Sequence, residues 1–179
     1  MKGPFQRQTV FSGKVFEVGI ETHQLPDGRH AEFEVVRHAG GAAVVPRLSD
    51  GSLLLIRQFR PAVGDMVYEI PAGRIDPGET HQQCALRELQ EETGYRAGQI
   101  RPLGGLLSAV GYCDEYVALF VADQLTWVGQ KPEPDELLEA CPMTLSAALA
   151  KLQAGEITDS KTQVALLRLA LLELEEPKP

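Results

Sequence analysis

The first forty residues carry short apolar runs separated by turn signals, the pattern of successive β-strands. The turn signals are Ser12-Gly13-Lys14 and Pro26-Asp27-Gly28, whose residue types favour reversal of the chain. The predicted strands lie at 9–11, 15–18, 21–25 and 30–36. A few strands alone bury too little apolar surface to be stable. The pattern therefore predicts an N-terminal antiparallel β-arm at residues 1–40 that packs on the main domain or on a partner subunit.

The following segments contain longer apolar runs. Two of them, 42–46 and 53–58, enclose Asp50-Gly51, which is typical of the turn in a β-hairpin. We therefore predict that these two strands form a hairpin. Further strands are predicted at 67–70, 103–108, 116–122 and 137–143.

A helix is predicted between Thr80 and Gly94. Thr80 with Gln83 three residues later forms a capping-box pattern, and Gly94 is a typical helix terminator. Apolar side chains recur at helical spacing between these ends and predict the face that packs on a core. They are Ala85, Leu86, Leu89 and Thr93.

Two more helices are predicted near the C-terminus. Thr144 caps the first, at 145–154, and Gly155 ends it, whereas Asp159 or Ser160 caps the second, which runs to Leu174. The predicted apolar face of the second helix consists of Val164, Leu167, Leu171 and Leu174. Strands, a helix, more strands and two helices, in that order, predict an α+β domain with a mixed sheet between helices.

Composition narrows the function classes. The chain has 179 residues, 44% of them hydrophobic, which suits one domain with a substantial core, and its apolar runs are too short or interrupted for a membrane span. Three widely spaced cysteines and no signal-peptide pattern favour the reducing cytoplasm over secretion. The net charge is −8 and no Lys/Arg cluster is present, so a nucleic-acid binder is not expected. An acidic protein with a phosphate-bearing substrate needs metal ions between the two.

Carboxylates crowd one stretch of the first predicted helix. Glu88 and Glu92 are one turn apart, Glu91 lies three positions from Glu88, and Glu79 precedes the first turn. Like charges at this spacing destabilise a helix by about 0.2–0.5 kcal/mol per pair. One reading is a solvated acidic face, as most charge runs are. The other is a site for Mg²⁺, which prefers carboxylate oxygens, waters and substrate phosphates.

The spacing of residues 73–95 favours the second reading, because it resembles the Nudix box, G-x5-E-x7-R-E-U-x-E-E-x-G-U, where U is a bulky apolar residue. The matching positions are Gly73, Glu79, Arg87, Glu88, Leu89, Glu91, Glu92 and Gly94, with Tyr95 at the usually aliphatic last position. Four further segments resemble the ADP-ribose pyrophosphatase branch of the Nudix hydrolases. They are Val36-Arg37-His38, Arg57-Gln58-Phe59-Arg60, Glu69-Ile70-Pro71-Ala72-Gly73 and Ile157-Thr158-Asp159-Ser160-Lys161-Thr162. This resemblance implies one domain over 1–179, an α/β/α sandwich, and a homodimer formed through the N-terminal strands.

Roles follow for the residues of the box. Glu88 and Glu92 are the expected metal ligands, with Glu91 as a ligand or as support, and the resemblance adds the main-chain carbonyl of Ala72. Two or more Mg²⁺ ions, or Mn²⁺, would neutralise phosphate charge and lower the pKa of bound water. Arg87 lies one turn before Glu91 and is expected to orient it, unless the two form an ordinary surface pair.

The general base and the substrate contacts lie elsewhere. By resemblance the base comes from the acidic loop 131–139, where Glu136 is the first candidate and Glu133 the second; the alternative is a solvated charged loop. For the substrate, arginine matches the geometry of phosphate, glutamate accepts from a ribose or adenine, and tyrosine stacks on a base. The candidates are Arg57, Arg60, Glu69 and Tyr112. Strand-end ion pairs for the arginines and a core position for Tyr112 are the alternatives.

The expected reaction is Mg²⁺-dependent hydrolysis of ADP-ribose to AMP and ribose 5-phosphate. Val110 stands where that branch often has proline, and the nearby Tyr112 resembles dinucleoside-polyphosphate hydrolases. Another nucleoside diphosphate substrate, such as GDP-mannose or a dinucleoside polyphosphate, therefore stays open. A non-catalytic sensor of ADP-ribose is a third reading, which the complete carboxylate set disfavours.

Overall fold

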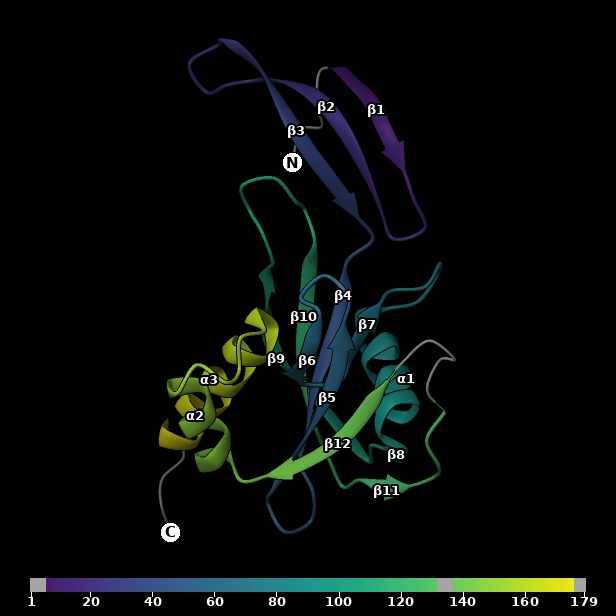
Figure 1. Ribbon diagram of the computed structural model, residues 1–179, viewed down its shortest axis with the longest axis vertical. Helices are drawn as coiled ribbons and strands as arrows, with labels where there is room; N and C mark the ends of the chain where they lie inside the picture. The colour runs from purple at the N-terminus through teal and green to yellow at the C-terminus, as the bar shows by residue number, and fades with distance from the viewer. Residues whose placement is uncertain (1–5, 132–136, 176–179) are drawn as a thin grey trace. The chain divides into compact units, whose positions relative to one another are not determined.

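The computed structural model describes residues 6–131 and 137–175, which Figure 1 shows in colour. The chain separates into two compact units. The first contains Met1–Gly40 and Leu107–Tyr116, and the second contains Gly41–Leu106 and Val117–Pro179. The first unit thus ends at the limit expected for the N-terminal arm, but it also includes a segment from the middle of the chain.

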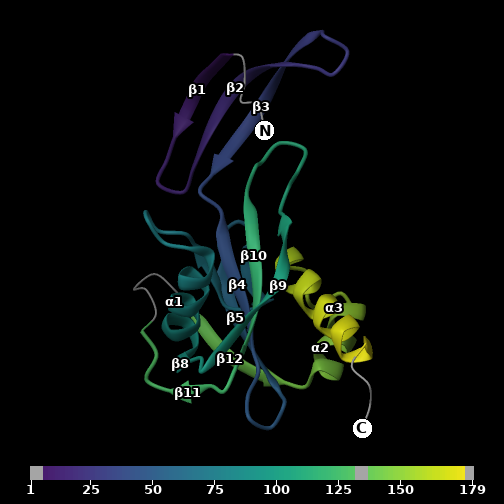
Figure 2. The ribbon, with the colours of Figure 1, turned by 180° about the vertical axis from the view of Figure 1, so that it is seen from behind.

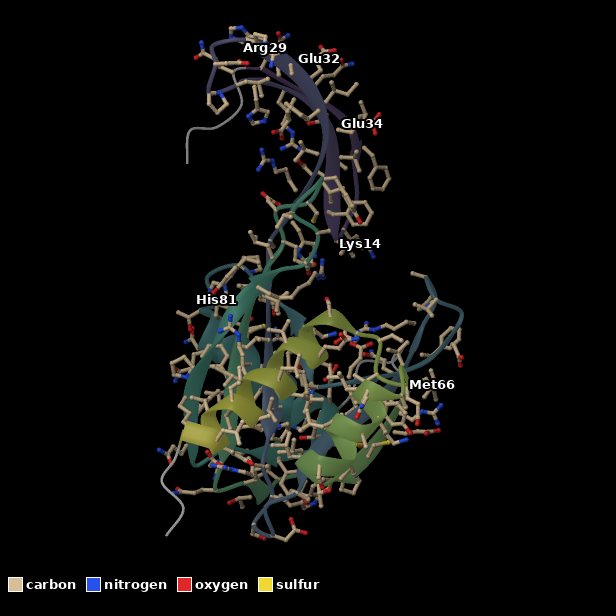
Figure 3. The ribbon with its side chains drawn as sticks, turned by 90° about the vertical axis from the view of Figure 1, so that its left-hand side faces the viewer. Lys14, Arg29, Glu32, Glu34, Met66 and His81 are labelled. Carbon is tan, nitrogen blue, oxygen red and sulfur yellow. The ribbon has the colours of Figure 1, made fainter. Side chains whose placement is uncertain are left out.

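The first unit is a three-stranded antiparallel sheet, β1 (Gln6–Ser12), β2 (Phe16–Gln24) and β3 (His30–His38), with β2 in the centre. Figure 3 labels Arg29, Glu32 and Glu34, which belong to β3 and the turn before it. The segment from the middle of the chain adds to this sheet by main-chain bonds. Val36 N donates to the Tyr112 carbonyl at 2.7 Å, and Asp114 N donates to the Val36 carbonyl at 3.2 Å.

One carboxylate organises a face of this sheet. Glu21 is fully buried, and its oxygens accept hydrogen bonds from the Arg37 guanidinium, with His23 Nε2 at 2.8 Å. Arg37 in turn donates to Asp114 at 2.9 Å. The hydrogen bond from Arg37 holds the pKa of Glu21 below its usual range, against the opposing effect of burial. This network ties the segment 107–116 to the arm.

The second unit contains the remaining strands and the three helices found in the described residues. The main sheet has the order β7 (Ala72–Arg74), β4 (Gly41–Pro46), β10 (Tyr116–Asp123), β9 (Gln99–Leu107), and it is mixed because β4 and β10 are parallel whereas β4 and β7 are antiparallel. A second sheet has the order β12 (Leu138–Met143), β5 (Leu53–Arg60), β6 (Asp65–Glu69), and β8 (Tyr95–Arg96) pairs with β11 (Thr126–Trp127). The helices are α1 (His81–Thr93), α2 (Leu145–Gln153) and α3 (Ser160–Glu175).

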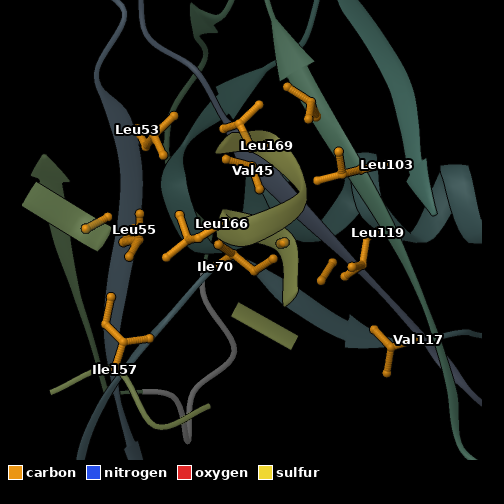
Figure 4. Packing of buried hydrophobic residues seen from close by; sticks show 14 residues of the cluster. Val45, Leu53, Leu55, Ile70, Leu103, Val117, Leu119, Ile157, Leu166 and Leu169 are labelled. Atoms are coloured by element: carbon orange, nitrogen blue, oxygen red, sulfur yellow. The ribbon is translucent and has the colours of Figure 1, made fainter. Parts of the chain in front are cut away.

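The main sheet lies between helices, as predicted. Side chains alternate between the two faces of a strand. On β4, Ala42 and Val44 pack with the α1 residues, whereas Ala43 and Val45 pack with the α3 residues. Figures 1 and 2 show α1 on one face of this sheet and α2 and α3 on the other. Figure 4 shows the larger core, in which Val45 and Leu119 of the sheet meet the α3 side. The α/β/α sandwich is therefore confirmed.

The predicted hairpin of 42–46 and 53–58 is wrong. The turn forms, with Gly51 at a φ of 84° and its N–H donating to the Leu48 carbonyl. The strands then separate into different sheets, and an isolated bridge between Arg47 and Leu53 is the pairing recorded between their ends. The reason is that β4 already has a partner on each edge, β7 and β10.

The predicted apolar face of α3 is wrong for three of its four residues, whereas Val164 packs against the core as predicted. Leu167, Leu171 and Leu174 are 47%, 59% and 77% exposed, and the buried residues follow a different stripe. The buried residues of α3 are Thr162, Ala165, Leu166 and Leu169. Hydrogen bonds at the start of α3 determine which side of the helix faces the core.

Thr162 makes these hydrogen bonds at the start of α3. Thr162 N donates to the Asp159 carboxylate at 2.9 Å, and Thr162 Oγ1 accepts from Ile70 N at the same distance. Asp159 rather than Ser160 therefore acts as the N-cap. Within the described residues, no helix has the length and apolar character needed to cross a bilayer.

Candidate active site

The helix that carries the carboxylates has well-defined ends. Gln83 N donates to Thr80 Oγ1 at 3.2 Å and Thr80 N donates to the Gln83 side chain at 2.9 Å, so the predicted capping box is confirmed. At the other end Gly94 adopts the left-handed conformation, with a φ of 77°, and its N–H donates to the Gln90 carbonyl. Capping groups satisfy the main chain at both ends. The carboxylates therefore lie on a rigid element.

Strand β7 runs closely along α1. Ala72 N donates to Glu92 Oε2 at 3.0 Å. At Gly73, an added Cβ would lie 1.7 Å from Glu88 Oε1, so the Glu88 carboxylate occupies the space that any other residue would fill. Glu88 and Glu92 are only 7% and 1% exposed. The close approach requires glycine at position 73 and brings two buried carboxylates against the main chain of β7.

Cys84 completes the same side of the helix, one turn before Glu88. Its Sγ lies 3.4 Å from the Gly73 carbonyl oxygen and 3.2 Å from that of Arg74, so the thiol donates to the strand. Burial, with the charge of Glu88, raises the pKa of the Cys84 thiol to about 12. A thiol with that pKa stays protonated at neutral pH, which makes Cys84 a packing residue and not a nucleophile.

Arg87 binds three of the box carboxylates at once. Its Nε and Nη2 each lie 3.0 Å from Glu79, and its Nη1 lies 2.6 Å from Glu88 and 2.9 Å from Glu91. The contact expected between Arg87 and Glu91 is present. Because Arg87 also spans Glu79 and Glu88, it is more than an ordinary surface pair on a helix. The hydrogen bond to Glu79 raises the pKa of Arg87, and the same bond lowers the pKa of Glu79.

Glu79 joins the loop before α1 to the helix. Its carboxylate accepts from Asp76 N at 3.1 Å as well as from Arg87, and Arg87 also donates to the Arg74 carbonyl at 2.9 Å. These bonds hold β7 and the loop that follows it at a set distance from Glu88 and Glu92.

The box offers hard oxygen ligands. Glu88 and Glu92 come from the helix, with Glu91 beside them and the Ala72 main chain opposite. Within the described ranges, no three His, Cys, Asp or Glu side chains form a ready-made metal cluster, and Arg87 engages Glu88 and Glu91. Mg²⁺ does not need such a cage, because it keeps several waters and takes one or two carboxylates plus substrate phosphates. The residues therefore fit a hard divalent cation.

A second charged cluster joins the ends of β5 and β6 to the start of α3. Arg60 donates to Glu69 through Nε at 2.6 Å and Nη2 at 2.8 Å. Lys161 Nζ donates to the same carboxylate and to Asp159 at 3.0 Å. Burial disfavours the charge of Glu69, but Arg60 and Lys161 outweigh it and lower the pKa of Glu69. The attraction of Glu92 contributes to the raised pKa of Arg60, which places this cluster within electrostatic reach of the box.

Sequence reasoning did not include Lys161 and Asp159 among the site residues. Both lie in the segment 157–162, whose resemblance to the ADP-ribose pyrophosphatase branch was a signal. The cap of α3 by Asp159 explains their position, because it points the first turn of the helix toward β6.

Arg57 is not brought together with Arg60. An odd separation along β5 places the two side chains on opposite faces of the sheet. Arg57 Nη1 lies 3.6 Å from Glu139, and its guanidinium lies 5.3 Å from the ring centre of Tyr68. A joint phosphate clamp from Arg57 and Arg60 within one chain is therefore not formed.

The other predicted site residues lie either in the first unit, and not in the unit that contains the box, or outside the described residues. Tyr112 belongs to the first unit and is 61% exposed, so the alternative of a core position is wrong. Glu133 and Glu136 fall outside the described residues.

The chain before that gap is attached to the end of α1, which the sequence did not reveal. Lys131 N donates to the Glu91 carbonyl at 3.1 Å, and Gln130 Nε2 donates to the Glu92 carbonyl at 2.6 Å. Val128 N donates to the Gly94 carbonyl at 2.8 Å. Helices leave their last carbonyls without intrahelical partners, and here the segment 128–131 supplies partners.

Comparison with known proteins decides the family. The sequence profile of the NUDIX domain matches residues 37–163, which is more than half of the chain and includes the whole box. The chain is a Nudix hydrolase. Members of this family generally need divalent metal ions, in agreement with the oxygen ligands described above.

Relatives extend the match beyond that domain. The chain is 36% identical over 169 residues to "ADP-ribose pyrophosphatase" of Bacillus subtilis (strain 168), covering 93% of this chain and 91% of the relative. It is 34% identical over 168 residues to "Methanol dehydrogenase activator" of Bacillus methanolicus, with the same coverage. A solved structure described as an ADP compounds hydrolase superposes with a TM-score of 0.81 over 96% of this Nudix hydrolase and 95% of that chain; at 23% identity it supports the fold alone.

Proposed function

We propose that this Nudix hydrolase cleaves the pyrophosphate bond of a nucleoside diphosphate sugar in a Mg²⁺-dependent reaction. The leading substrate is ADP-ribose, and the products are AMP and ribose 5-phosphate. One observation carries the proposal: two buried carboxylates, Glu88 and Glu92, face the main chain of Ala72 and Gly73, with Arg87 fixing their surroundings. The full-length similarity to a protein named as an ADP-ribose pyrophosphatase supports the choice of substrate.

Charge explains why metal is required. The chain carries a net charge of −8, and the substrate adds two phosphate charges. Bound Mg²⁺, or Mn²⁺, in two or more positions would neutralise the phosphates and lower the pKa of the attacking water. Glu88, Glu92 and the Ala72 carbonyl would hold these ions, and Glu91 would bind or support them.

Proton removal from the water needs a base. Glu136, and after it Glu133, remain the predicted bases on the acidic loop 131–139. The attachment of residues 128–131 to the last turn of α1 supports this prediction, because it starts that loop beside Glu91 and Glu92. A base must come within hydrogen-bond distance of the water in the bound complex.

Arg60 is the favoured contact for the substrate phosphates. It uses its Nε and Nη2 edge for Glu69, so the Nη1 and Nη2 edge is turned away from that carboxylate. Glu69 is 2% exposed and already accepts from Arg60 and Lys161, which favours a supporting role over the predicted contact with adenine or ribose. Arg57 and Tyr112 stay predicted substrate contacts.

A substrate panel tests the proposal. The purified protein with Mg²⁺ is incubated with ADP-ribose, GDP-mannose, a dinucleoside polyphosphate and a nucleoside triphosphate, beside the Glu92→Gln variant. Fastest cleavage of ADP-ribose, with the variant at least a hundredfold slower, supports the proposal. Faster cleavage of another diphosphate would keep the chemistry and replace the substrate. Binding of ADP-ribose without cleavage would instead support the sensor reading.

We also propose that two copies associate through the N-terminal strands. Five large apolar side chains in the N-terminal segment of this unit are 42–55% exposed, and gathered apolar surface of this kind is typical of protein interfaces. They are Val10, Phe11, Val15, Phe16 and Phe33. Light scattering coupled to size-exclusion chromatography should give twice the 19.5 kDa chain mass. A monomer mass at micromolar concentration would contradict this proposal.

A further inference from the structure

The ion network of Arg60, Glu69, Lys161 and Asp159 runs from the interior to the surface. The side chains of Glu69 and Lys161 are 3% and 14% exposed, Asp159 is 18% exposed, and Arg60 is 39% exposed. Arg60 is thus the outermost member. The inner members connect it to both β6 and the start of α3.

The charges of this network balance. Glu69 and Asp159 carry two negative charges, and Arg60 and Lys161 carry two positive charges. Lys161 lies between the two carboxylates and contacts both. Asp159 also attracts Arg60, since its charge contributes to the raised pKa of that guanidinium. Without Lys161, Arg60 would be the remaining cation of the network for the carboxylates of both Glu69 and Asp159.

The guanidinium of Arg60 has a fixed orientation because Lys161 holds the Glu69 carboxylate to which it is bonded. Within the described part of the chain, Glu69 is the one carboxylate with which Arg60 forms an ion pair, and the bond is bidentate. Bidentate pairing sets the plane of the guanidinium. Displacing Glu69, or drawing Arg60 inward toward Asp159, would turn the outward edge away from a phosphate.

We propose that Lys161 is a positioning residue for the substrate: it fixes Glu69 and neutralises Asp159, so that Arg60 presents its outward edge to the phosphates of the nucleoside diphosphate sugar. This inference rests on the proposed function, because it assigns Arg60 to that substrate. Lys161 itself touches no reacting atom. Its effect should therefore fall on substrate affinity more than on the chemical step.

The first test is steady-state kinetics with ADP-ribose and Mg²⁺ for Lys161→Met, which keeps the length of the side chain and removes its charge. We expect KM to rise about tenfold, which corresponds to about 1.4 kcal/mol, with kcat changed less than about threefold. Lys161→Arg should restore most of the affinity. Lys151→Met is the matched control, because Lys151 pairs with the exposed Glu156 on the surface; its KM should equal that of the wild type.

A double-mutant comparison separates positioning from a purely structural role. Arg60→Gln should raise KM, and adding Lys161→Met should change it little further, because Lys161 acts through Arg60. Multiplying effects of the two substitutions would overturn the inference. So would an unchanged KM in Lys161→Met, or a fall in kcat alone. If Lys161→Met is poorly folded, Glu69→Gln weakens the same support of Arg60 while changing the network charge in the opposite direction, and it should also raise KM.

A binding measurement tests the role of Lys161 separately from the proposed function. Binding of an ADP-ribose analogue with a methylene bridge between the phosphates is measured by calorimetry for the wild type and Lys161→Met. Weaker binding by the variant supports the inference whichever diphosphate the wild type cleaves fastest. Equal binding, together with normal cleavage by the wild type, would reject the role of Lys161 and leave the proposed function intact.

Discussion

Replacing Gly73 by alanine should inactivate the site without unfolding the protein. The new Cβ would lie 1.7 Å from Glu88 Oε1 and 2.2 Å from its Cδ, where contacts below 3.0 Å do not persist. The carboxylate is the far end of a flexible side chain, so it moves instead of the backbone. To reach 3.0 Å, Glu88 Oε1 must shift by about 1.3 Å.

A shift of that size has different consequences for activity and stability. A displacement of about 1 Å at a catalytic group costs on the order of a hundredfold in rate, so kcat/KM for ADP-ribose should fall at least a hundredfold. Gly73 does not adopt a positive φ, and alanine there reduces the entropy of the unfolded chain. The melting temperature should therefore change by no more than about 2–4 °C, the equivalent of about 1 kcal/mol in a chain of this size.

Gly51→Ala is the control with the opposite expectation. Gly51 has a φ of 84° in an open turn, with no heavy atom near an added Cβ. Alanine in that conformation costs about 1–2 kcal/mol, so stability should fall while kcat/KM stays within about twofold of the wild type. Differential scanning fluorimetry and initial rates with Mg²⁺ measure both quantities. Wild-type activity in Gly73→Ala would refute the close packing of Glu88 against β7.

Three further predictions follow from burial and charge. Removing divalent metal with EDTA should abolish hydrolysis. Added Mg²⁺ should raise the melting temperature of the wild type more than that of Glu92→Gln, as measured by fluorimetry, and equal shifts would argue against Glu92 as a ligand. The pKa of Glu69 is lowered on folding, so its stabilising effect is present above the unfolded pKa of about 4.3 and is lost as pH falls through the folded pKa. In urea titrations, the stability of Glu69→Gln should therefore decline less than that of the wild type as pH falls from 6 to the acid limit. A parallel decline of the two proteins would contradict the ion network. Leu169→Ala should lower the free energy of unfolding by about 2–5 kcal/mol, because Leu169 is 1% exposed. Leu171 is 59% exposed, so Leu171→Ala should change that free energy by no more than about 0.5 kcal/mol. Reversed values in denaturant unfolding would support the α3 face predicted from the sequence.

Local features were predictable from the sequence. The ends of α1 depend on Thr80, Gln83 and Gly94, whose bonds span few residues, and all three behave as the pattern indicated. The box carboxylates were predictable because helical spacing alone places Glu88 and Glu92 on one side of the helix. Three strands of the main sheet, β4, β9 and β10, were found from their apolar runs, whereas the short β7 was not, and the sandwich followed from the order of elements.

Features that depend on long-range contacts were missed or mistaken. The face of α3 was misread because a polar residue, Thr162, points inward to bond Ile70, 92 positions earlier in the chain. The attachment of Gln130 to the end of α1 joins residues 38 positions apart. Apolar patterning carries no information about such polar contacts.

Strand pairing failed for a related reason. A turn such as Asp50-Gly51 predicts a reversal, but not whether the strands on either side remain partners. Here β4 pairs with β7 on one edge and with β10 on the other, so β5 joins another sheet. The uninterrupted apolar run at 42–45 was the available hint, because a strand whose side chains are all apolar is typically covered on both faces inside a sheet.

The most direct test of the account is the rate of AMP formation from ADP-ribose by the wild type and by Glu92→Gln across a Mg²⁺ titration. The account predicts Mg²⁺-dependent release of AMP and ribose 5-phosphate in equal amounts by the wild type, and a rate at least a hundredfold lower for the variant at every Mg²⁺ concentration. AMP formation that is independent of Mg²⁺, or a variant as fast as the wild type, would contradict the assignment of the buried carboxylates of α1 to a metal-dependent pyrophosphatase site.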